Sequence, residues 1–159
     1  SGVSAESLSG VRAEVERVAD RLGRRPKLLV GKPGLDGHSN GAEQIAVRAR
    51  DCGFEVVYEG IRLTPAQLAN AALEESVHVV GLSILSGSHV LLVEETLRQM
   101  RSRGIGDVPV VVGGIIPPED AAKLKGFGVA AVFTPKDFDL TRIMGEIVAI
   151  VDEAALAAA

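Results

Sequence analysis

The chain has no tryptophan, one tyrosine and four phenylalanines among its 159 residues, so aromatic side chains cannot dominate its core. Apolar residues still make up 47% of the chain, which leaves valine, leucine, isoleucine and alanine to be buried. A core of small aliphatic side chains is typical of layered folds in which helices cover a parallel sheet. The length suits a single domain that folds without metal or disulfide support.

Other absences narrow the class of protein. The one cysteine, Cys52, cannot form an intrachain disulfide, which predicts a reducing, cytoplasmic setting and a role as a small apolar filler. No apolar run approaches the roughly 18 residues of a transmembrane helix, and the opening SGVSAESLSG lacks an export signal, so we expect a soluble protein without a membrane partner. The net charge of -4 and the lack of a basic stripe argue against nucleic acid as a partner.

Five apolar runs of strand length are present, at 27–32, 55–61, 77–85, 108–116 and 130–135. All but the second are nearly continuous, as in parallel strands that are covered on both faces. Segments of helical period follow them, beginning near residues 40, 65, 88, 118 and 140. We therefore predict a doubly wound, flavodoxin-like α/β fold with a five-stranded parallel sheet in the order 2-1-3-4-5.

An additional helix is expected at about residues 5–22, before the first strand. It could cover the sheet or lead from another domain. We divide the chain into an N-terminal helix and linker, residues 1–24, and a ligand-binding domain, residues 25–155.

Three unusual stretches follow the first, third and fourth predicted strands, namely KPGLDGHSNG (32–41), SILSG (83–87) and GGIIPP (113–118). Ligands of doubly wound sheets bind beyond the carboxyl ends of the strands, where the strand order reverses. The three stretches should therefore meet at one edge. Taken singly, each also fits an ordinary glycine-rich loop, in which a lone aspartate or histidine is a cap or a solvated group.

Several chemistries that use this edge do not fit. A Walker A loop needs its lysine after the glycines, and Lys32 precedes them. The dinucleotide pattern G-x-G-x-x-G is not met, a phosphoacceptor domain would carry aspartate in place of Ser83, and no nucleophile elbow is present. What remains is His38 as a metal ligand, whose second N–H could be held by Asp36, two residues earlier.

Three short motifs carry a resemblance to a known family. Asp36-x-His38-x-x-Gly41, Ser83-x-Leu85 and Gly113-Gly114 resemble the DxHxxG, SxL and GG signature of cobalamin-binding domains. The similarity extends over about residues 25–152. It implies that the histidine replaces the nucleotide base of cobalamin as the lower axial cobalt ligand, while the displaced nucleotide tail enters a slot beside the sheet.

On this resemblance His38 ligates cobalt, Asp36 holds His38, and Lys32 holds Asp36. Ser83 would bond the buried dimethylbenzimidazole, and the glycine pair would leave room for the tail. The full set of expected cofactor-binding residues is Lys32, Gly34, Asp36, Gly37, His38, Gly41, Ser83, Leu85, Gly87, Gly113, Gly114 and Thr134. His78 and His89 are weaker alternatives to His38, because His78 lies inside a predicted strand and His89 starts a predicted helix with no carboxylate two residues away.

Within the family, the wording of these segments resembles acyl-CoA mutases, and most of all ethylmalonyl-CoA mutase. Pro33, Ser39 and Asn40 are residues at which methylmalonyl-CoA mutases tend to differ, and they leave the ligand set untouched. The implied cofactor is adenosylcobalamin, whose Co–C bond breaks homolytically to start a radical rearrangement of ethylmalonyl-CoA to methylsuccinyl-CoA. Methylmalonyl-CoA or hydroxyisobutyryl-CoA remains an alternative substrate.

A substrate-binding barrel does not fit into 159 residues beside this domain. We therefore expect an excised domain or a small subunit of a mutase, with no catalytic residue of its own and with a barrel domain or subunit as partner in a dimeric enzyme. Two rivals use the same motif. A corrinoid methyl carrier usually has a helical bundle ahead of the motif, and a cobalamin-dependent sensor would bring a DNA-binding module.

Overall fold

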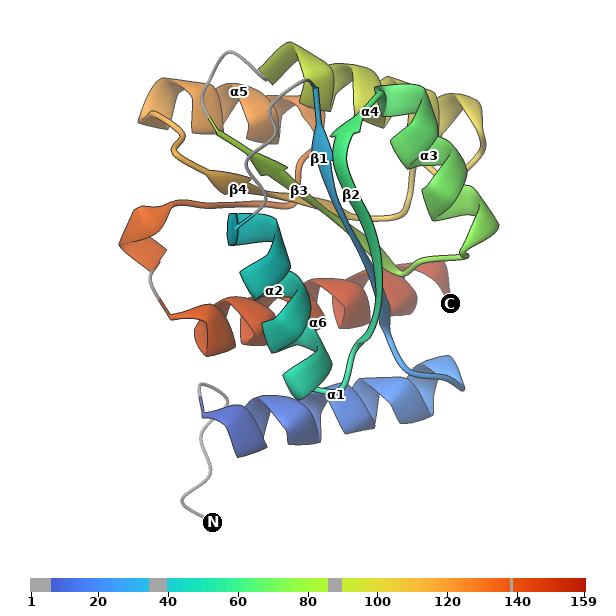
Figure 1. Cartoon of the computed structure of the whole chain (residues 1–159). Helices are drawn as coiled ribbons and strands as arrows, with labels where there is room; N and C mark the ends of the chain where they lie inside the picture. Colours follow the sequence, from blue (N-terminus) through green and yellow to red (C-terminus); the bar gives the residue numbers. More distant parts are fainter. Residues whose placement is uncertain (1–6, 35–39, 86–89, 138) are drawn as a thin grey trace.

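The computed structural model describes residues 7–34, 40–85, 90–137 and 139–159 (Figure 1). Five parallel strands form one sheet in the order β2-β1-β3-β4-β5, which confirms the predicted doubly wound topology. The strands are β1 (Lys27–Pro33), β2 (Glu55–Leu63), β3 (Val79–Ile84), β4 (Val110–Gly114) and β5 (Ala131–Phe133). The α-helices are α1 (Leu8–Leu22), α2 (Asn40–Asp51), α3 (Pro65–Glu74), α4 (Val90–Ser102), α5 (Pro118–Phe127) and α6 (Leu140–Ala158).

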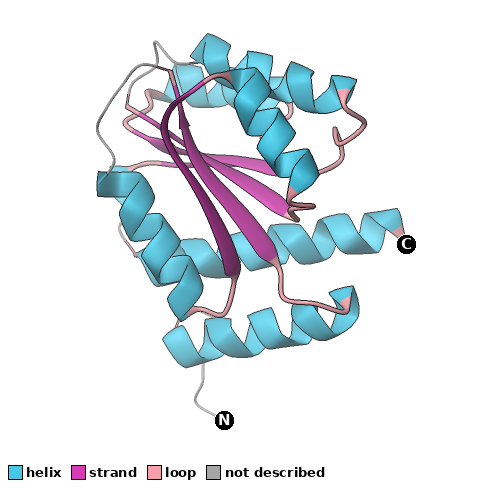
Figure 2. Cartoon of the chain, turned by 45° about the vertical axis from the view of Figure 1, so that its right-hand side comes forward, coloured by secondary structure: helices cyan, strands magenta, loops and turns pink. Residues whose placement is uncertain are grey.

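Helices cover both faces of the sheet (Figure 2). On one face, α1, α2 and α6 share an apolar cluster with side chains such as Leu28, Val30 and Val111. On the other face, α3, α4 and α5 share a second cluster with side chains such as Leu29 and Val112. Successive strand residues point to opposite faces, so continuous apolar runs serve both clusters. The sheet therefore separates two cores.

The N-terminal helix α1 packs on the α2 and α6 face. Val11, Val15 and Val18, at most 3% exposed, join the apolar cluster of that face. Asp152 of α6 pairs with Arg17 at 3.1 Å and with Arg21 at 2.8 Å. Of the two roles considered from the sequence, the structure shows that this helix covers the domain's own core.

Element ends differ from the sequence-based bounds by a few residues. The predicted strands 77–85 and 108–116 are shorter in the structure, where β3 and β4 end at Ile84 and Gly114. The last helix begins at Leu140, as predicted, and continues through its alanine-rich end to Ala158, since alanine favours helix. The start of α3 was predicted correctly, since Thr64 and Gln67 form a reciprocal capping box there.

The one cysteine is buried. Cys52 lies in the apolar cluster of the α2 and α6 face, where burial raises the pKa of its thiol, as suits an apolar filler.

Among the residues described here, no helix combines the length and the apolarity that crossing a membrane requires.

Candidate functional site

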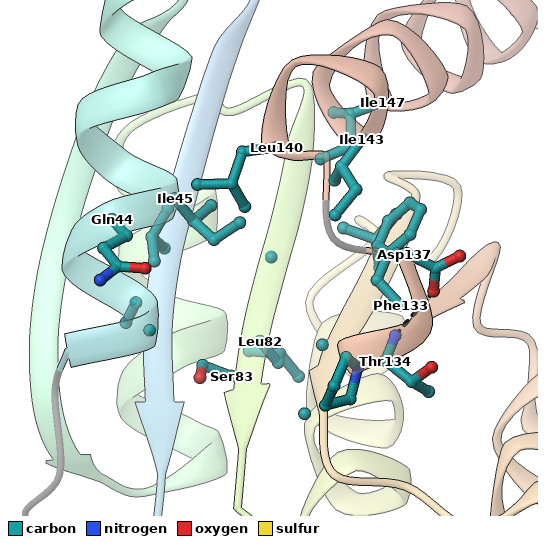
Figure 3. Close-up of a pocket in the computed structure, with 18 of the residues that line it drawn as sticks. Gln44, Ile45, Leu82, Ser83, Phe133, Thr134, Asp137, Leu140, Ile143 and Ile147 are labelled. Carbon is teal, nitrogen blue, oxygen red and sulfur yellow. Dashed lines mark hydrogen bonds between the residues drawn. The ribbon is translucent and has the colours of Figure 1, made fainter.

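A cavity of about 440 Å³ lies between the sheet and the helices α2 and α6, at the carboxyl half of the strands (Figure 3). Its volume falls within the roughly 300–1,000 Å³ that is typical of small-molecule sites. The sheet side is lined by Leu28, Val30, Gly81, Leu82, Ser83, Val111, Gly113, Gly114, Ile115, Phe133, Thr134 and Pro135. The other side is lined by Gly41, Ala42, Gln44, Ile45, Asp137, Leu140, Ile143 and Ile147.

Small strand residues keep the cavity open. Ser83 of β3 lies beside Gly113 of β4 in the sheet register, and Gly81 lies two residues before Ser83 on the same face. Of the atoms in the described ranges, a Cβ atom added to Gly113 would meet only the Phe133 carbonyl oxygen, at the ordinary contact distance of 3.8 Å. Its backbone is not in the left-handed region either. No described residue requires glycine at position 113, so the space that it leaves is available to a ligand.

The neighbouring glycine has a different reason. Gly114 has a φ angle of 155°, and a Cβ atom there would lie 1.8 Å from the carbonyl oxygen of Ile84. The strands β3 and β4 approach too closely at this point for any side chain. Gly114 lines the cavity, but the fold itself already demands glycine at this position.

The first turn of α2 lies beside the end of β3. A Cβ atom on Gly41 would lie 3.9 Å from the Ser83 hydroxyl oxygen, so the first and second predicted motifs meet here. Within the described part of the chain, the Ser83 hydroxyl and the Gln44 amide have no hydrogen-bond partner. Both are free to bond a ligand in the cavity.

A short turn closes the side near β5. The Thr134 backbone N–H donates to the Asp137 carboxylate at 2.8 Å, and the Asp137 N–H donates to the Thr134 carbonyl oxygen at 2.8 Å. The turn leads into α6, whose N-cap Asp139 accepts from the Thr141 and Arg142 amides. These bonds hold the turn and the start of α6 beside the cavity.

Apolar side chains of α2 and α6 form the opposing walls, mainly Ile45, Leu140, Ile143 and Ile147 (Figure 3). The two helices are joined across the domain by Arg48, which donates to the Thr141 hydroxyl at 2.8 Å. This bond helps to set the width of the cavity, because it ties α2 to the first turn of α6.

The structure brings together five of the predicted site residues. Gly41, Ser83, Gly113, Gly114 and Thr134 all line the cavity. Three others do not line it, namely Lys32, Gly34 and Leu85. The predictions for Asp36, Gly37, His38 and Gly87, and the alternative His89, lie outside the described residues.

The residues that do not line the cavity still lie at the same edge. Lys32, near the end of β1, is only 4% exposed. Gly34 has a φ angle of 92°, which favours glycine, and its N–H donates to the Leu63 carbonyl oxygen at 2.9 Å. Leu85 follows β3 and is 43% exposed. Gly34 therefore fastens the end of β1 to the end of β2.

Sequence reasoning missed the walls of the cavity and part of its floor. Gly81 had a usable signal, because a glycine inside an apolar strand often marks a close approach or an unfilled space. Phe133, Ile143 and Ile147 had none, since they follow the spacing of ordinary core residues. Gln44 likewise resembles any polar residue of an amphipathic helix.

His78, the other alternative ligand, lies at the opposite end of the sheet. Its Nδ1 atom accepts the Lys27 backbone N–H at 2.9 Å, just before β3 begins. Burial lowers the pKa of His78, and the nearby Arg24 and Lys27 charges act in the same direction. It is a structural residue and has no part in the cavity.

This arrangement predicts a pH-dependent stability. A protonated Nδ1 atom cannot accept the Lys27 N–H. As the pH falls, the His78 side chain of the unfolded chain therefore binds a proton before that of the folded chain does. Folding is favoured at higher pH for this reason. The free energy of unfolding should be highest above about pH 6.5 and should fall by about 1 kcal/mol as the pH drops toward the lowered pKa. Urea unfolding between pH 7.5 and 5 measures this effect.

The matched control is His78→Asn, whose side-chain oxygen can accept the same N–H without titrating. It should flatten this part of the pH profile, and the other histidines are present in both proteins. Identical profiles for the two proteins would contradict the assignment.

Comparisons with known proteins show what this chain is similar to. Residues 26–138 match the family described as the B12 binding domain. The chain is 63% identical over 153 residues to ethylmalonyl-CoA mutase of Cereibacter sphaeroides, and 53% identical over 158 residues to that of Methylorubrum extorquens; each match covers 96% of this chain and 23% of the relative. Methylmalonyl-CoA mutase of Escherichia coli is 41% identical over 132 residues, which cover 83% of this chain and 18% of the relative.

The chain thus spans less than a quarter of the length of the curated relatives that it matches. Among solved structures, a cobalamin-binding protein from Desulfitobacterium hafniense superposes with a TM-score of 0.66 at 21% identity, covering 87% of this chain and 68% of that chain. At that identity the likeness shows the fold alone.

Proposed function

The chain belongs to the B12-binding domain family, and from that premise we propose that it binds adenosylcobalamin as the cofactor-binding part of an acyl-CoA mutase. In this proposal His38 would bind the cobalt, and the nucleotide tail of the cofactor would occupy the cavity beside α2. One observation supports this proposal above all. Gly41, Ser83 and Gly113 are distant in the sequence, yet they lie around one cavity that small residues leave open.

The residues of the cavity suit a nucleotide tail. Its floor at Gly81 and Gly113 lacks side chains, and its walls are mainly apolar, which favours a flat apolar ring. The Ser83 hydroxyl offers one hydrogen bond to a ring nitrogen. Burying the tail there excludes water from the base and stabilises the bound state through lost apolar surface.

The loop that carries the proposed ligand is anchored at both ends. Gly34 bonds to Leu63 before the loop, and α2 begins at Asn40 after it. His38 would donate one imidazole nitrogen to cobalt, and Asp36 would accept the N–H of the other, which fixes the ring orientation. Lys32, buried at the end of β1, would supply the positive charge that favours an ionised Asp36.

Bound adenosylcobalamin supplies the carbon radical that starts a carbon-skeleton rearrangement. We propose the conversion of ethylmalonyl-CoA to methylsuccinyl-CoA, supported by the higher identity to ethylmalonyl-CoA mutases, 63% and 53%, than to the methylmalonyl-CoA mutase at 41%. The remaining three quarters of such a relative would supply the substrate-binding barrel. The proposal that the full enzyme is a dimer rests on the resemblance to mutases. The proposal of a reducing, cytoplasmic setting is supported by Cys52, which forms no disulfide.

An absorbance titration with adenosylcobalamin tests the proposal. Binding should convert the cofactor from its base-on spectrum to the spectrum of a base-off, histidine-bound corrinoid. Unchanged base-on absorbance, or no corrinoid retained by the protein after ultrafiltration, would overturn the proposed function.

The isolated chain is also expected to bind the cofactor without isomerising any acyl-CoA. Catalysis requires the substrate to be held against the reactive carbon, and the described residues form no second domain to hold it. Chromatography of ethylmalonyl-CoA after incubation with the loaded chain measures this. Product formed by the chain alone would contradict the role as a carrier, and product formed only after adding a mutase barrel would support it.

A further inference from the structure

Arg62, the last residue but one of β2, has a backbone conformation that an arginine disfavours. Its φ angle is 59°, in the left-handed region, which glycine enters freely and side chains such as arginine rarely adopt. Two residues earlier, Gly60 takes a φ angle of 90° without such strain. The fold would therefore accept glycine at position 62 more readily than arginine, so the backbone does not explain this residue.

The strained residue belongs to an irregular stretch of the sheet. The register between β1 and β2 shifts between Gly31 and Pro33. Over this interval a single residue of β1, Lys32, lies opposite two residues of β2, Ile61 and Arg62, as in a β-bulge. Bulges often lie next to functional sites, where they change the direction of a side chain. The irregular register is thus a second sign that the end of β2 serves a site.

This stretch lies at the edge of the sheet where the cofactor is proposed to bind. The strands β1 and β2 end side by side (Figure 1), and Leu63, directly after Arg62, accepts the Gly34 N–H at 2.9 Å. Gly34 in turn directly precedes the loop that carries His38. Adjacent strands are about 4.8 Å apart, so Arg62 starts one strand spacing from the end of β1.

No described residue holds the side chain of Arg62. It is exposed, and within the ranges that the structure describes it forms no hydrogen bond or ion pair. It does not line the cavity beside α2 either. Strained residues occur mainly at ligand sites, where the strain holds a group in place for binding. The strain at Arg62, which neither packing nor pairing explains, therefore indicates a ligand for its guanidinium.

The cofactor offers this guanidinium two kinds of acceptor. The rim of the corrin ring carries acetamide and propionamide side chains with carbonyl oxygens, and the nucleotide tail carries a phosphate. A guanidinium has five N–H donors and no acceptor, so it can bond to either. The tail is proposed to lie in the cavity, and no described residue of β2 lines that cavity. The rim amides are therefore the acceptors that the position of Arg62 favours.

We infer that Arg62 is a further cofactor-binding residue, whose guanidinium donates hydrogen bonds to amide carbonyl oxygens at the rim of the corrin ring. The inference rests on the proposed function, since it concerns the same cofactor. It gives β2 a part in holding the cofactor that is separate from the cavity, and it explains why a strained arginine stands where glycine would suit the fold.

Arg62→Gly tests the inference, because the residue's two effects have opposite signs. Relief of the left-handed strain should leave the protein no less resistant to urea than the original chain. Loss of the guanidinium should weaken the binding of adenosylcobalamin about tenfold, as expected for a hydrogen bond from a charged donor, with the histidine-bound spectrum preserved. Ultrafiltration measures the affinity and absorbance the spectrum. Partial unfolding cannot produce this combination.

Ser76→Gly is the matched control. Ser76 has a φ angle of 50°, and it precedes His78 at the opposite end of the sheet. The substitution keeps the backbone carbonyl that accepts a hydrogen bond from Arg24. It should relieve strain in the same way and leave cofactor binding unchanged.

Arg62→Asn controls for the flexibility of glycine, because asparagine tolerates the left-handed conformation and is less flexible. Its side chain is too short to replace the guanidinium, so it should weaken binding as much as Arg62→Gly does. If Arg62→Asn binds the cofactor like the original chain, the loss in Arg62→Gly comes from a flexible backbone and the inference is overturned.

Adenosylcobinamide distinguishes the two acceptors, because it keeps the rim amides and has no nucleotide tail. Arg62→Gly should weaken its binding by the same factor as that of adenosylcobalamin. A loss confined to adenosylcobalamin would assign Arg62 to the tail phosphate and overturn the inference. Unchanged binding of both corrinoids would also overturn it, while the proposed function would stand. Retention of neither corrinoid by the original chain would overturn the proposed function and the inference with it.

Discussion

Replacing His38 with alanine is expected to abolish the histidine-bound spectrum of adenosylcobalamin and to weaken binding by more than about a hundredfold. Removing only the residue that orients a metal ligand already lowers the affinity about ten- to a hundredfold, and here the ligand itself is removed. The fold should be unaffected, because the described ends of the loop, Gly34 and α2, are held by backbone bonds. An absorbance titration gives the spectrum and the affinity, and circular dichroism checks the fold.

Asp36→Asn is the graded companion of this variant. It retains the side-chain shape but loses the charge that favours the cobalt-bound imidazole, so the affinity should fall about ten- to a hundredfold with the histidine-bound spectrum preserved. His78→Asn serves as a control, because His78 lies at the other end of the sheet. A His38→Ala protein that binds with an unchanged spectrum would refute the assignment of the ligand.

Gly113→Val is expected to separate complete cobalamins from cobinamide. Among the described residues, the nearest neighbour of the new Cβ atom is the Phe133 carbonyl oxygen at the ordinary distance of 3.8 Å, and valine suits a strand. It would instead fill the floor beside Ser83 and obstruct the tail, which should weaken cobalamin binding about ten- to a hundredfold. Cobinamide, which has no tail to insert, should bind as before.

Gly114→Ala provides the contrast one residue later. Its Cβ atom would overlap the Ile84 carbonyl oxygen at 1.8 Å, and its φ angle of 155° disfavours a side chain. We expect the free energy of unfolding, measured with urea, to fall by about 1–3 kcal/mol. Equal loss of cobalamin and cobinamide binding in Gly113→Val would show that this glycine, too, serves the fold.

The topology was predictable because burial on both faces leaves a simple trace in the sequence. The runs that became β3 and β4 are apolar at nearly every position, and such runs occur when helices cover a sheet on both sides. Exact ends were not predictable in this way. Ile115 and Ile116 continue the apolar run after Gly114, but pairing with β3 ends at Gly114, so β4 stops earlier than hydrophobicity indicates.

The candidate site was predictable where it depends on motifs and not where it depends on shape. Gly41, Ser83 and Gly113 stand in recognisable spacing, and the sheet order brings them together. Phe133 and Ile147 become walls only because α6 packs at a particular distance from the sheet, and no local pattern encodes that distance. The two reasons for the glycine pair likewise needed coordinates, because the position of Ile84 and the φ angle of Gly114 distinguish Gly114 from Gly113.

The sheet that divides the two apolar cores also divides the evolutionary constraints on the chain. A substitution beneath α3, α4 or α5 has to satisfy packing alone, and cores accept many combinations of similar total volume. A substitution on the α2 and α6 side has to satisfy packing and also leave an unfilled volume that packing alone would disfavour. The first face should therefore tolerate more changes of residue type than the second, on which each change must also keep the cavity open.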